Sequence, residues 1–316
     1  MAPAVKTAGS PGLFSKNDII LTTSISMGYL LLCKILIGNK VEQLILVLLF
    51  NTLFYLSHPT RKFITGFSVF IVFWIIFDFM KAFPNYQYNT VHIESLYNAE
   101  KQLFGIGVNG LRLTPNEYWQ QHNTTFLDII SGLFYLCWMP VPLFFAGYLF
   151  FAKRREQFMQ FALTFLFVNL IGFVGYYMYP AAPPWYVQQY GFAFNAHTPG
   201  NTAGLHRFDD YFHAGIFSAL YSKSSNVFAA MPSLHASYPL IVLYFGIKNK
   251  LGWINAVFTL IMAGIWFSAI YSSHHYVLDI LAGIVCAMAG IGLFEWSVAK
   301  SNTLKKALQM FVRAIE

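Results

Sequence analysis

The sequence is poor in charged residues. Only 10% of its 316 residues are Asp, Glu, Lys or Arg, whereas 57% are hydrophobic. A soluble globular domain carries about 25% charged residues, so the shortage excludes that class and indicates an integral membrane protein with one membrane domain. The formal net charge of +7 does not indicate a nucleic-acid partner, because the basic residues are scattered among apolar segments.

Cysteine is also scarce. The chain has three cysteines, Cys33, Cys137 and Cys286, and each falls within a hydrophobic segment. An odd number in apolar surroundings argues against a disulfide framework. The sequence has no internal repeats and no low-complexity segments, and we expect no cleavable signal peptide in the polar residues 1–18.

Long apolar runs make up most of the remaining sequence. A membrane-spanning helix needs about 20 mostly apolar residues. Eight stretches are candidates, of which the second and sixth are short: about 18–38, 41–57, 63–83, 127–152, 158–180, 232–247, 251–272 and 276–298. The sequence therefore predicts an all-α fold, a polytopic membrane helical bundle of about eight spans.

These stretches suggest three parts. Residues 1–62 form an N-terminal tail and a two-helix hairpin, and residues 63–298 form a six-helix membrane core. Two long polar-to-mixed connections interrupt the core, at 84–126 and 181–231. Residues 299–316 read as a short amphipathic helix on the cytoplasmic membrane surface.

The loop charges predict the orientation in the membrane. With the N-terminus inside, 13 of the 20 Lys and Arg residues fall in inner segments and 5 in outer loops. Cytoplasmic loops carry an excess of Lys and Arg, so we expect both termini in the cytoplasm. Both long connections then lie on the outer, periplasmic or lumenal, face.

Two histidine-bearing stretches begin spans on that outer face. In "YSSHHYVLDI" (271–280), His275 and Asp279 are four residues apart and would share one face of a helix, whereas His274 would not face Asp279. Such a carboxylate fixes the imidazole tautomer and leaves the other ring nitrogen free to act as a nucleophile. The pair therefore predicts a nucleophile, His275, with an orienting partner, Asp279.

The second stretch, "AAMPSLHASYP" (229–239), has the complementary groups. Pro232 favours the first turn of a helix, and the free N–H groups of that turn, with the Ser233 hydroxyl, form an anion site. His235 can give or take a proton beside the bound anion. Together the two stretches predict a phosphate site with a nucleophile on one helix and an acid/base on another.

Other interpretations of these residues stay open. A single intramembrane histidine or aspartate can serve packing alone, and His274 taken by itself is best read as a supporting residue. His235, His275 and Asp279 can also be three zinc ligands, but no further histidine or cysteine motif supports a metal, and we expect none. A proton-relaying transporter is a third class, although no inverted repeat is present.

The same residues carry a resemblance to a known family. "MPSLHAS" and "HHYVLDILAG" resemble the second and third motifs of the type 2 phosphatidic acid phosphatase superfamily, whose members act through a phosphohistidine without a metal. Two features depart from that pattern. No Arg-Pro dipeptide of the first motif occurs, and Ala269 stands where an arginine is usual.

A narrower resemblance accounts for these departures. "GFVGYYMYPAAPPWYVQQYG" (172–191) and "GLHRFDDYF" (204–212), followed by the two histidine motifs, resemble the inositol phosphorylceramide synthases in content and order. The resemblance implies a phosphatidic acid phosphatase-like six-helix core and transfer of phosphoinositol from phosphatidylinositol to ceramide. It implies lipid substrates and no cofactor, and no partner subunit can be deduced. The alternative is a lipid phosphate or polyprenyl diphosphate phosphatase with water as acceptor.

The resemblance also implies roles for individual residues. His275 is the nucleophile, Asp279 its orienting partner and His235 the acid/base. Arg207 is the preferred phosphate-binding cation. The further phosphate or head-group candidates are Ser233, Lys223, Arg112, Trp185, Tyr186 and His274, of which Lys223 and Arg112 are weaker because basic loop residues are usually solvated.

Overall fold

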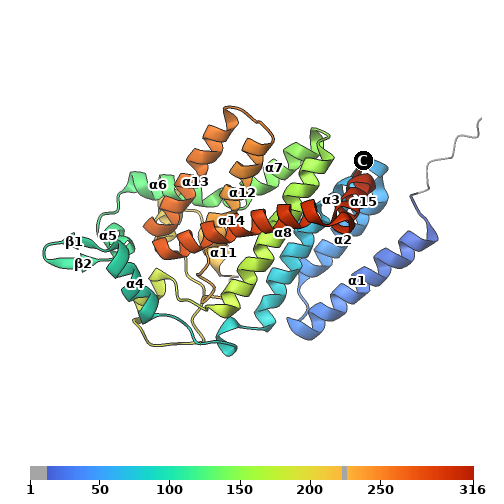
Figure 1. Ribbon diagram of the computed structural model, residues 1–316. Coiled ribbons are helices and arrows are strands. Elements are labelled where there is room, and N and C mark those ends of the chain that lie inside the picture. Colours follow the sequence, from blue (N-terminus) through green and yellow to red (C-terminus); the bar gives the residue numbers. More distant parts are fainter. Residues whose placement is uncertain (1–12, 223–225) are drawn as a thin grey trace, which may run out of the picture. The chain divides into compact units, whose positions relative to one another are not determined.

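The computed structural model describes residues 13–222 and 226–316. Its regular structure is helical apart from one small hairpin, which confirms the all-α prediction (Figure 1). The described residues fall into two compact units, one reaching to Ala82 and including Phe311–Glu316, the other running from Phe83 to Met310. Lys223, a candidate phosphate ligand, lies outside the described residues.

The first unit contains three long helices, α1 (Lys16–Leu36), α2 (Val41–Leu56) and α3 (His58–Phe79), followed by η1 (Met80–Ala82). Ser15 and Ser57 begin α1 and α3 because each hydroxyl accepts a backbone N–H of the first turn. Arg61 then joins α3 to α1 through an ion pair with Asp18 at 3.0 Å. The sequence predicts α3 as the first span of the core, whereas the structure groups its residues with the N-terminal helices.

The second unit contains both histidine motifs. Its elements are η2 (Asn85–Gln87), α4 (Glu94–Phe104), β1 (Ile106–Val108), β2 (Leu111–Leu113), α5 (Pro115–Gln121), α6 (Thr125–Leu136), α7 (Pro140–Phe151), α8 (Arg155–Met178), α9 (Pro184–Tyr190), η3 (Ala203–Leu205), α10 (His206–Phe212), α11 (Ile216–Tyr221), α12 (Leu234–Lys248), α13 (Ile254–Tyr271), α14 (Val277–Lys300) and the part of α15 (Asn302–Ile315) that ends at Met310. Strands β1 and β2 pair antiparallel, with Ile106 opposite Leu113. The two long connections are therefore rich in short helices.

Fewer helices are long and apolar enough to span a membrane than the sequence suggests. In the described part of the chain, five helices are long and apolar enough to span: α1, α3 with η1, α8, α13 and α14. The expected span 127–152 is two helices, α6 and α7, bent by 43°. Pro140 opens α7, and proline disrupts a continuing helix by removing a backbone N–H. With 16 and 15 residues, α2 and α12 are short, so the count of eight stays a prediction.

Close packing of four helices positions the histidine motifs. Helix α12 packs against both α13 and α14, and α6 packs against α13 (Figure 1). A Cβ added to Gly283 of α14 would lie 2.1 Å from the Ser233 carbonyl oxygen, so only glycine permits this approach. Ser237 of α12 also donates to the Gly283 carbonyl at 2.8 Å. The starts of α12 and α14 are thereby held together.

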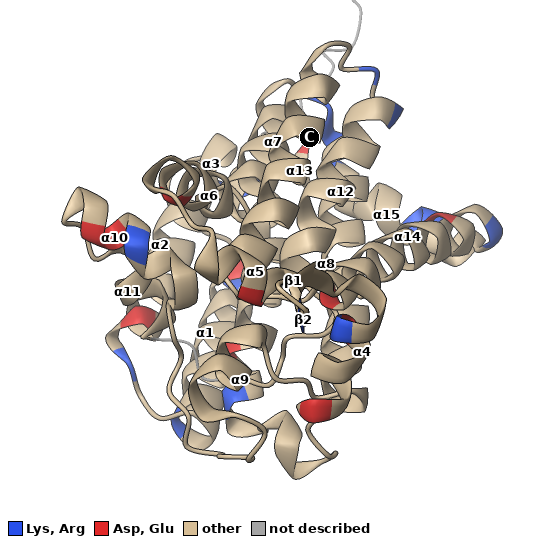
Figure 2. Ribbon diagram, turned by 90° about the vertical axis from the view of Figure 1, so that its left-hand side faces the viewer, with Lys and Arg blue, Asp and Glu red and all other residues tan. Residues whose placement is uncertain are grey.

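Charged residues are sparse along these helices. Figure 2 shows that most of the ribbon carries neither Lys, Arg, Asp nor Glu, while α10 carries both signs. This distribution suits helices whose sides face lipid. The charges on α10 belong to the segment that includes Arg207.

Candidate active site

The two histidines of the predicted site meet at the heads of α12 and α14. His235 lies in the first turn of α12, and His275 lies two residues before the first residue of α14. Their rings approach with Nδ1 of His235 3.0 Å from Nε2 of His275, although the residues are 40 apart in sequence. The structure therefore brings together the predicted nucleophile and the predicted acid/base.

Asp279 completes this arrangement. Its Oδ2 lies 3.4 Å from Nδ1 of His275, and the carboxylate is fully buried. The expected contact is present, but its local geometry differs from the expectation of one helical face. His275 precedes the helix, and Asp279 in the first turn of α14 reaches back to it while accepting the Tyr276 N–H at 2.8 Å. The carboxylate thus holds the helix start, and its orienting role toward His275, whose Nδ1 has no hydrogen-bond partner among the described residues, stays a prediction.

The electrostatics favour neutral imidazoles at His274 and His275. Burial lowers the pKa of His275 to about 4. Burial, and then the neighbouring His275, lower the pKa of His274 to about 3. Both imidazoles are therefore uncharged near pH 7, and a neutral imidazole has a free lone pair for attack on phosphorus.

Ser233 begins α12 and is buried. Its hydroxyl accepts the Ala236 N–H at 3.3 Å, and its own N–H donates to the Asp279 carbonyl at 2.9 Å. Pro232 was expected within the first turn of the helix but precedes the cap residue. The observed hydrogen bonds of Ser233 link the two motifs, and its role as a phosphate ligand stays a prediction.

His274 takes no part in the contact between His235 Nδ1 and His275 Nε2. Its Nε2 lies 2.9 Å from the Thr202 carbonyl oxygen. Its ring stacks on Tyr221 at 4.5 Å between centroids and on Tyr135 at 5.4 Å. The supporting role predicted for His274 stays a prediction.

Arg207, the predicted phosphate-binding cation, lies beside the start of the loop that carries His274 and His275. Its Nε donates to Asp128 Oδ1 at 2.5 Å, and the Tyr271 hydroxyl donates to the same oxygen at 2.7 Å. The Gly204 N–H, three residues earlier, donates to the Ser272 carbonyl at 2.9 Å and joins this segment to the histidine loop. Within residues 13–222 and 226–316, buried Nη2 of Arg207 has no hydrogen-bond partner. Phosphate binding by Arg207 stays a prediction.

Sequence reasoning missed several polar residues that support the site. Asn116 of α5 donates from Nδ2 to the carbonyls of Ile270 and His275, at 2.8 and 2.9 Å. Asp128, the partner of Arg207, was also missed. Neither residue lies in a recognisable motif, and both come from the stretch 116–128, far from the histidines in sequence.

Glu100 of α4 is a further missed residue. Its two carboxylate oxygens accept the Val277 and Leu278 N–H groups at 2.9 and 3.1 Å, which caps the start of α14. Burial raises the pKa of Glu100 to about 7 even though these N–H groups favour the charged form. An acidic residue at a helix N-terminus is a familiar pairing, but its position 177 residues earlier concealed it.

Trp185 and Tyr186 are both buried in one apolar cluster with Phe228. The backbone N–H of Trp185 donates to the Ser273 carbonyl at 3.0 Å, which supports the histidine loop. The Tyr186 hydroxyl donates to the Ala193 carbonyl at 2.7 Å. Their contact with a lipid head group stays a prediction.

The weaker cation Arg112 lies on β2 and donates to the Gln102 carbonyl at 2.6 Å at an exposed position. No contact between Arg112 and the histidines is present in the described part of the chain. A search of the described residues finds no group of three or more His, Cys, Asp or Glu side chains that could hold a metal ion.

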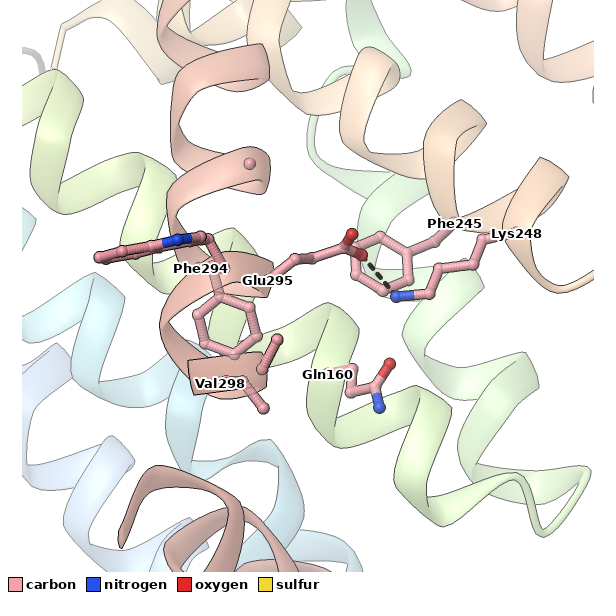
Figure 3. A pocket seen from close by; sticks show the side chains of 9 residues that line it. Gln160, Phe245, Lys248, Phe294, Glu295 and Val298 are labelled. Carbon is pink, nitrogen blue, oxygen red and sulfur yellow. Dashed lines mark hydrogen bonds and ion pairs between the residues drawn. The ribbon is translucent and has the colours of Figure 1, made fainter. Parts of the chain in front are cut away.

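A cavity of about 520 Å³ lies far from the histidines. It is lined by residues of α8, α12 and α14, and the Lys248–Glu295 ion pair crosses it at 2.5 Å (Figure 3). Lys248 ends α12 whereas His235 begins it, which separates them by about 20 Å along the axis at 1.5 Å per residue. The cavity is therefore not the site of the paired histidines.

Membrane-spanning helices with a His–His–Asp cluster at the heads of two packed helices define a polytopic membrane protein with a paired-histidine site. The chain belongs to the PAP2 superfamily, whose family model matches residues 110–293. The predicted resemblance at superfamily level is thereby confirmed.

Curated relatives extend the match over nearly the whole chain. The chain is 45% identical to a phosphoinositol dihydroceramide synthase of Bacteroides thetaiotaomicron over 303 residues, which cover 96% of this chain and 99% of the relative. It is 27% identical to an inositol phosphorylceramide synthase of Candida albicans over 82% of this chain and 53% of the relative.

A third relative is the catalytic subunit of inositol phosphorylceramide synthase from Saccharomyces cerevisiae. It is 28% identical over 75% of this chain and 59% of the relative. The chain thus spans only about half of the length of these fungal relatives, but almost all of the bacterial one. No solved structure matches the chain.

Proposed function

We propose that the protein is a membrane phosphotransferase that moves phosphoinositol from phosphatidylinositol to a ceramide through a phosphohistidine on His275. The observation that carries the proposal is the His235–His275 approach at 3.0 Å, with Asp279 behind His275. The full-length similarity to a phosphoinositol dihydroceramide synthase favours dihydroceramide as the acceptor.

In the first step, Asp279 accepts the Nδ1–H of His275 and leaves the Nε2 lone pair free. Nε2 attacks the phosphorus of the donor, an N–P bond forms, and the bond from phosphorus to the diacylglycerol oxygen breaks. His235, protonated at this stage, gives its proton to that oxygen. Diacylglycerol leaves, and phosphoinositol stays on His275.

In the second step, the acceptor lipid takes the place of diacylglycerol. Neutral His235 removes the proton from the primary hydroxyl of the ceramide, and the hydroxyl oxygen attacks phosphorus. The N–P bond breaks, which releases the phosphorylated lipid and returns His275 neutral and His235 protonated. Arg207 stabilises the phosphoryl oxygens in both steps through its guanidinium N–H groups.

The site is proposed to face the outer side of the membrane, with both termini in the cytoplasm. The excess of Lys and Arg in the inner segments supports this orientation. A cysteine introduced as Gly200→Cys, in a background without the three native cysteines, should react with an impermeant thiol reagent in intact cells. Labelling only after permeabilisation would reverse the orientation.

The activity is tested with radiolabelled phosphatidylinositol and purified protein in lipid nanodiscs. Labelled inositol phosphosphingolipid should form only when ceramide or dihydroceramide is added, and His275→Ala should abolish both this product and the acid-labile, base-stable phosphoenzyme. His235→Ala should reduce turnover by orders of magnitude, whereas His274→Ala should be milder. Release of a soluble phosphate product without a lipid acceptor would instead support a phosphatase, and phosphoenzyme in His275→Ala would exclude His275 as nucleophile.

A further inference from the structure

The ring of His235 is enclosed by aromatic residues of α6 and of the connection that follows it. Tyr135 is 1% exposed, and its hydroxyl oxygen lies 3.3 Å from Nδ1 of His235. Trp138 meets the same imidazole edge to face at 4.6 Å between centroids. The nitrogen that Tyr135 contacts is the one that faces His275.

A hydrogen bond from Tyr221 orients the Tyr135 hydroxyl. Tyr221 of α11 donates its own hydroxyl proton to the Tyr135 oxygen at 3.4 Å. A phenol oxygen that accepts a hydrogen bond becomes a better donor through its own proton. Among the described residues in hydrogen-bond contact with Tyr135, the acceptor left for that proton is Nδ1 of His235.

We propose that Tyr135 is a positioning residue that holds Nδ1 of His235 toward the reacting phosphorus and stabilises the neutral form of His235 between the two transfer steps. This inference rests on the proposed function. After His235 has protonated diacylglycerol, its Nδ1 carries a lone pair and no acceptor lipid is yet bound. The Tyr135 O–H then donates to this lone pair and keeps the base ready for the ceramide hydroxyl.

The two halves of the reaction should depend unequally on the Tyr135 hydroxyl. Formation of the phosphoenzyme needs protonated His235, which gains nothing from a donor at Nδ1. Transfer to the acceptor needs neutral His235, which a Tyr135 hydrogen bond favours. Loss of the hydroxyl should therefore slow the second half more than the first.

Other ionisable groups around His235 must be accounted for when pH is varied. His275 and, one position away, His274 face it from the loop before α14, and both are buried and neutral near pH 7. Tyr135 of α6 contacts His235, and Tyr221 of α11 contacts Tyr135. None of these groups changes charge between about pH 5 and 8, because burial lowers the pKa of the two imidazoles and raises the pKa of Tyr221.

The test is the variant Tyr135→Phe, which removes one oxygen. Breakdown of labelled phosphoenzyme by ceramide should fall about 3- to 10-fold, the range for one neutral hydrogen bond, with little change in its rate of formation. The acid limb of the breakdown rate should move to higher pH by about half to one unit. Tyr238→Phe is the matched control, because Tyr238 is also buried on the His235 helix but donates to Asn169 at 2.6 Å.

A second variant keeps the test informative if Tyr135→Phe does not fold. Incorporation of 3-fluorotyrosine at position 135 preserves the ring and makes the phenol a stronger donor, so the acid limb should move to lower pH. Superimposable pH profiles in the phenylalanine and fluorotyrosine proteins, or equal slowing of both half-reactions, would overturn the inference. Phosphoenzyme in His275→Ala would instead overturn the proposed function, so the two failures are distinguishable.

Discussion

The side-chain amide of Asn116 donates a hydrogen bond to the backbone carbonyl of His275 at 2.9 Å. The other proton of the same amide nitrogen goes to the Ile270 carbonyl at 2.8 Å. These two carbonyls lie at the end of α13 and in the loop after it. One buried side chain therefore holds the loop from which His275 reaches His235.

Removal of this amide should loosen the catalytic loop. Asn116→Ala removes the donor to the His275 carbonyl, and a buried unsatisfied group costs about 1–3 kcal/mol. The Ile270 carbonyl still accepts the Ser273 N–H at 3.0 Å. We expect a lower melting temperature and a kcat reduced at least about tenfold, with little change in KM. Asn123→Ala is the control, since its amide bonds only to the Gln120 carbonyl at an exposed site. Equal kcat values for the two variants would contradict this role of Asn116.

Arg207 should act on the charge that develops at phosphorus. Arg207→Gln removes the cation while keeping an amide, and loss of one such donor costs about 10²–10³ in rate. The measurement is kcat/KM for the donor lipid, compared with Arg112→Gln on the exposed hairpin. Nearly full activity in Arg207→Gln would leave the phosphate-binding cation to be found elsewhere.

Glu100 makes stability depend on pH in a direction that is unusual for a carboxylate. Its pKa in the folded protein is about 7, above the ordinary value of 4.5, so the folded state holds a proton more tightly than the unfolded state. Stability from this group is present below about pH 4.5 and is lost as pH rises to about 7.

The variant Glu100→Gln cannot titrate and should flatten that decline. Thermal unfolding in detergent at pH 5 and at pH 7.5 measures the difference, which should be smaller in the variant than in the wild type. Glu94→Gln, at the exposed start of the same helix, serves as the control. An unchanged slope in Glu100→Gln would show that other groups govern the pH dependence.

Gly283 should tolerate no side chain. In Gly283→Ala the new Cβ would lie 2.1 Å from the Ser233 carbonyl oxygen, so the starts of α12 and α14 would have to separate. Overpacking of this kind costs about 1–3 kcal/mol, and the separation would also lengthen the His235–His275 approach.

Both the melting temperature and kcat of Gly283→Ala should therefore fall. Gly292→Ala on the same helix is the matched control, because its Cβ would meet no atom within 4 Å. There, alanine should be neutral or stabilising, since it favours a helix over glycine by about 1 kcal/mol. Wild-type activity in Gly283→Ala would contradict the close helix contact.

The sequence by itself determined the class of fold and pointed to the groups that we propose react. The shortage of charge and the long apolar runs leave a membrane helical bundle as the solution, because backbone polar groups in lipid must be satisfied internally. The local patterns around His235 and His275 indicated a nucleophile, an acid/base and an orienting carboxylate, because these roles depend on residue type and near-neighbour spacing.

Only the tertiary structure decided how those groups meet and what supports them. Asn116 and Glu100 reach the histidine loop and the start of α14 from 159 and 177 residues away. Tyr135 reaches His235 across 100 residues. No local pattern marks such residues, since their roles arise from hydrogen bonds between elements brought together by helix packing. Asp279 also lies near His275 for a structural reason. The first turn of α14 has free N–H groups that need acceptors, and the Asp279 carboxylate accepts the Tyr276 N–H there.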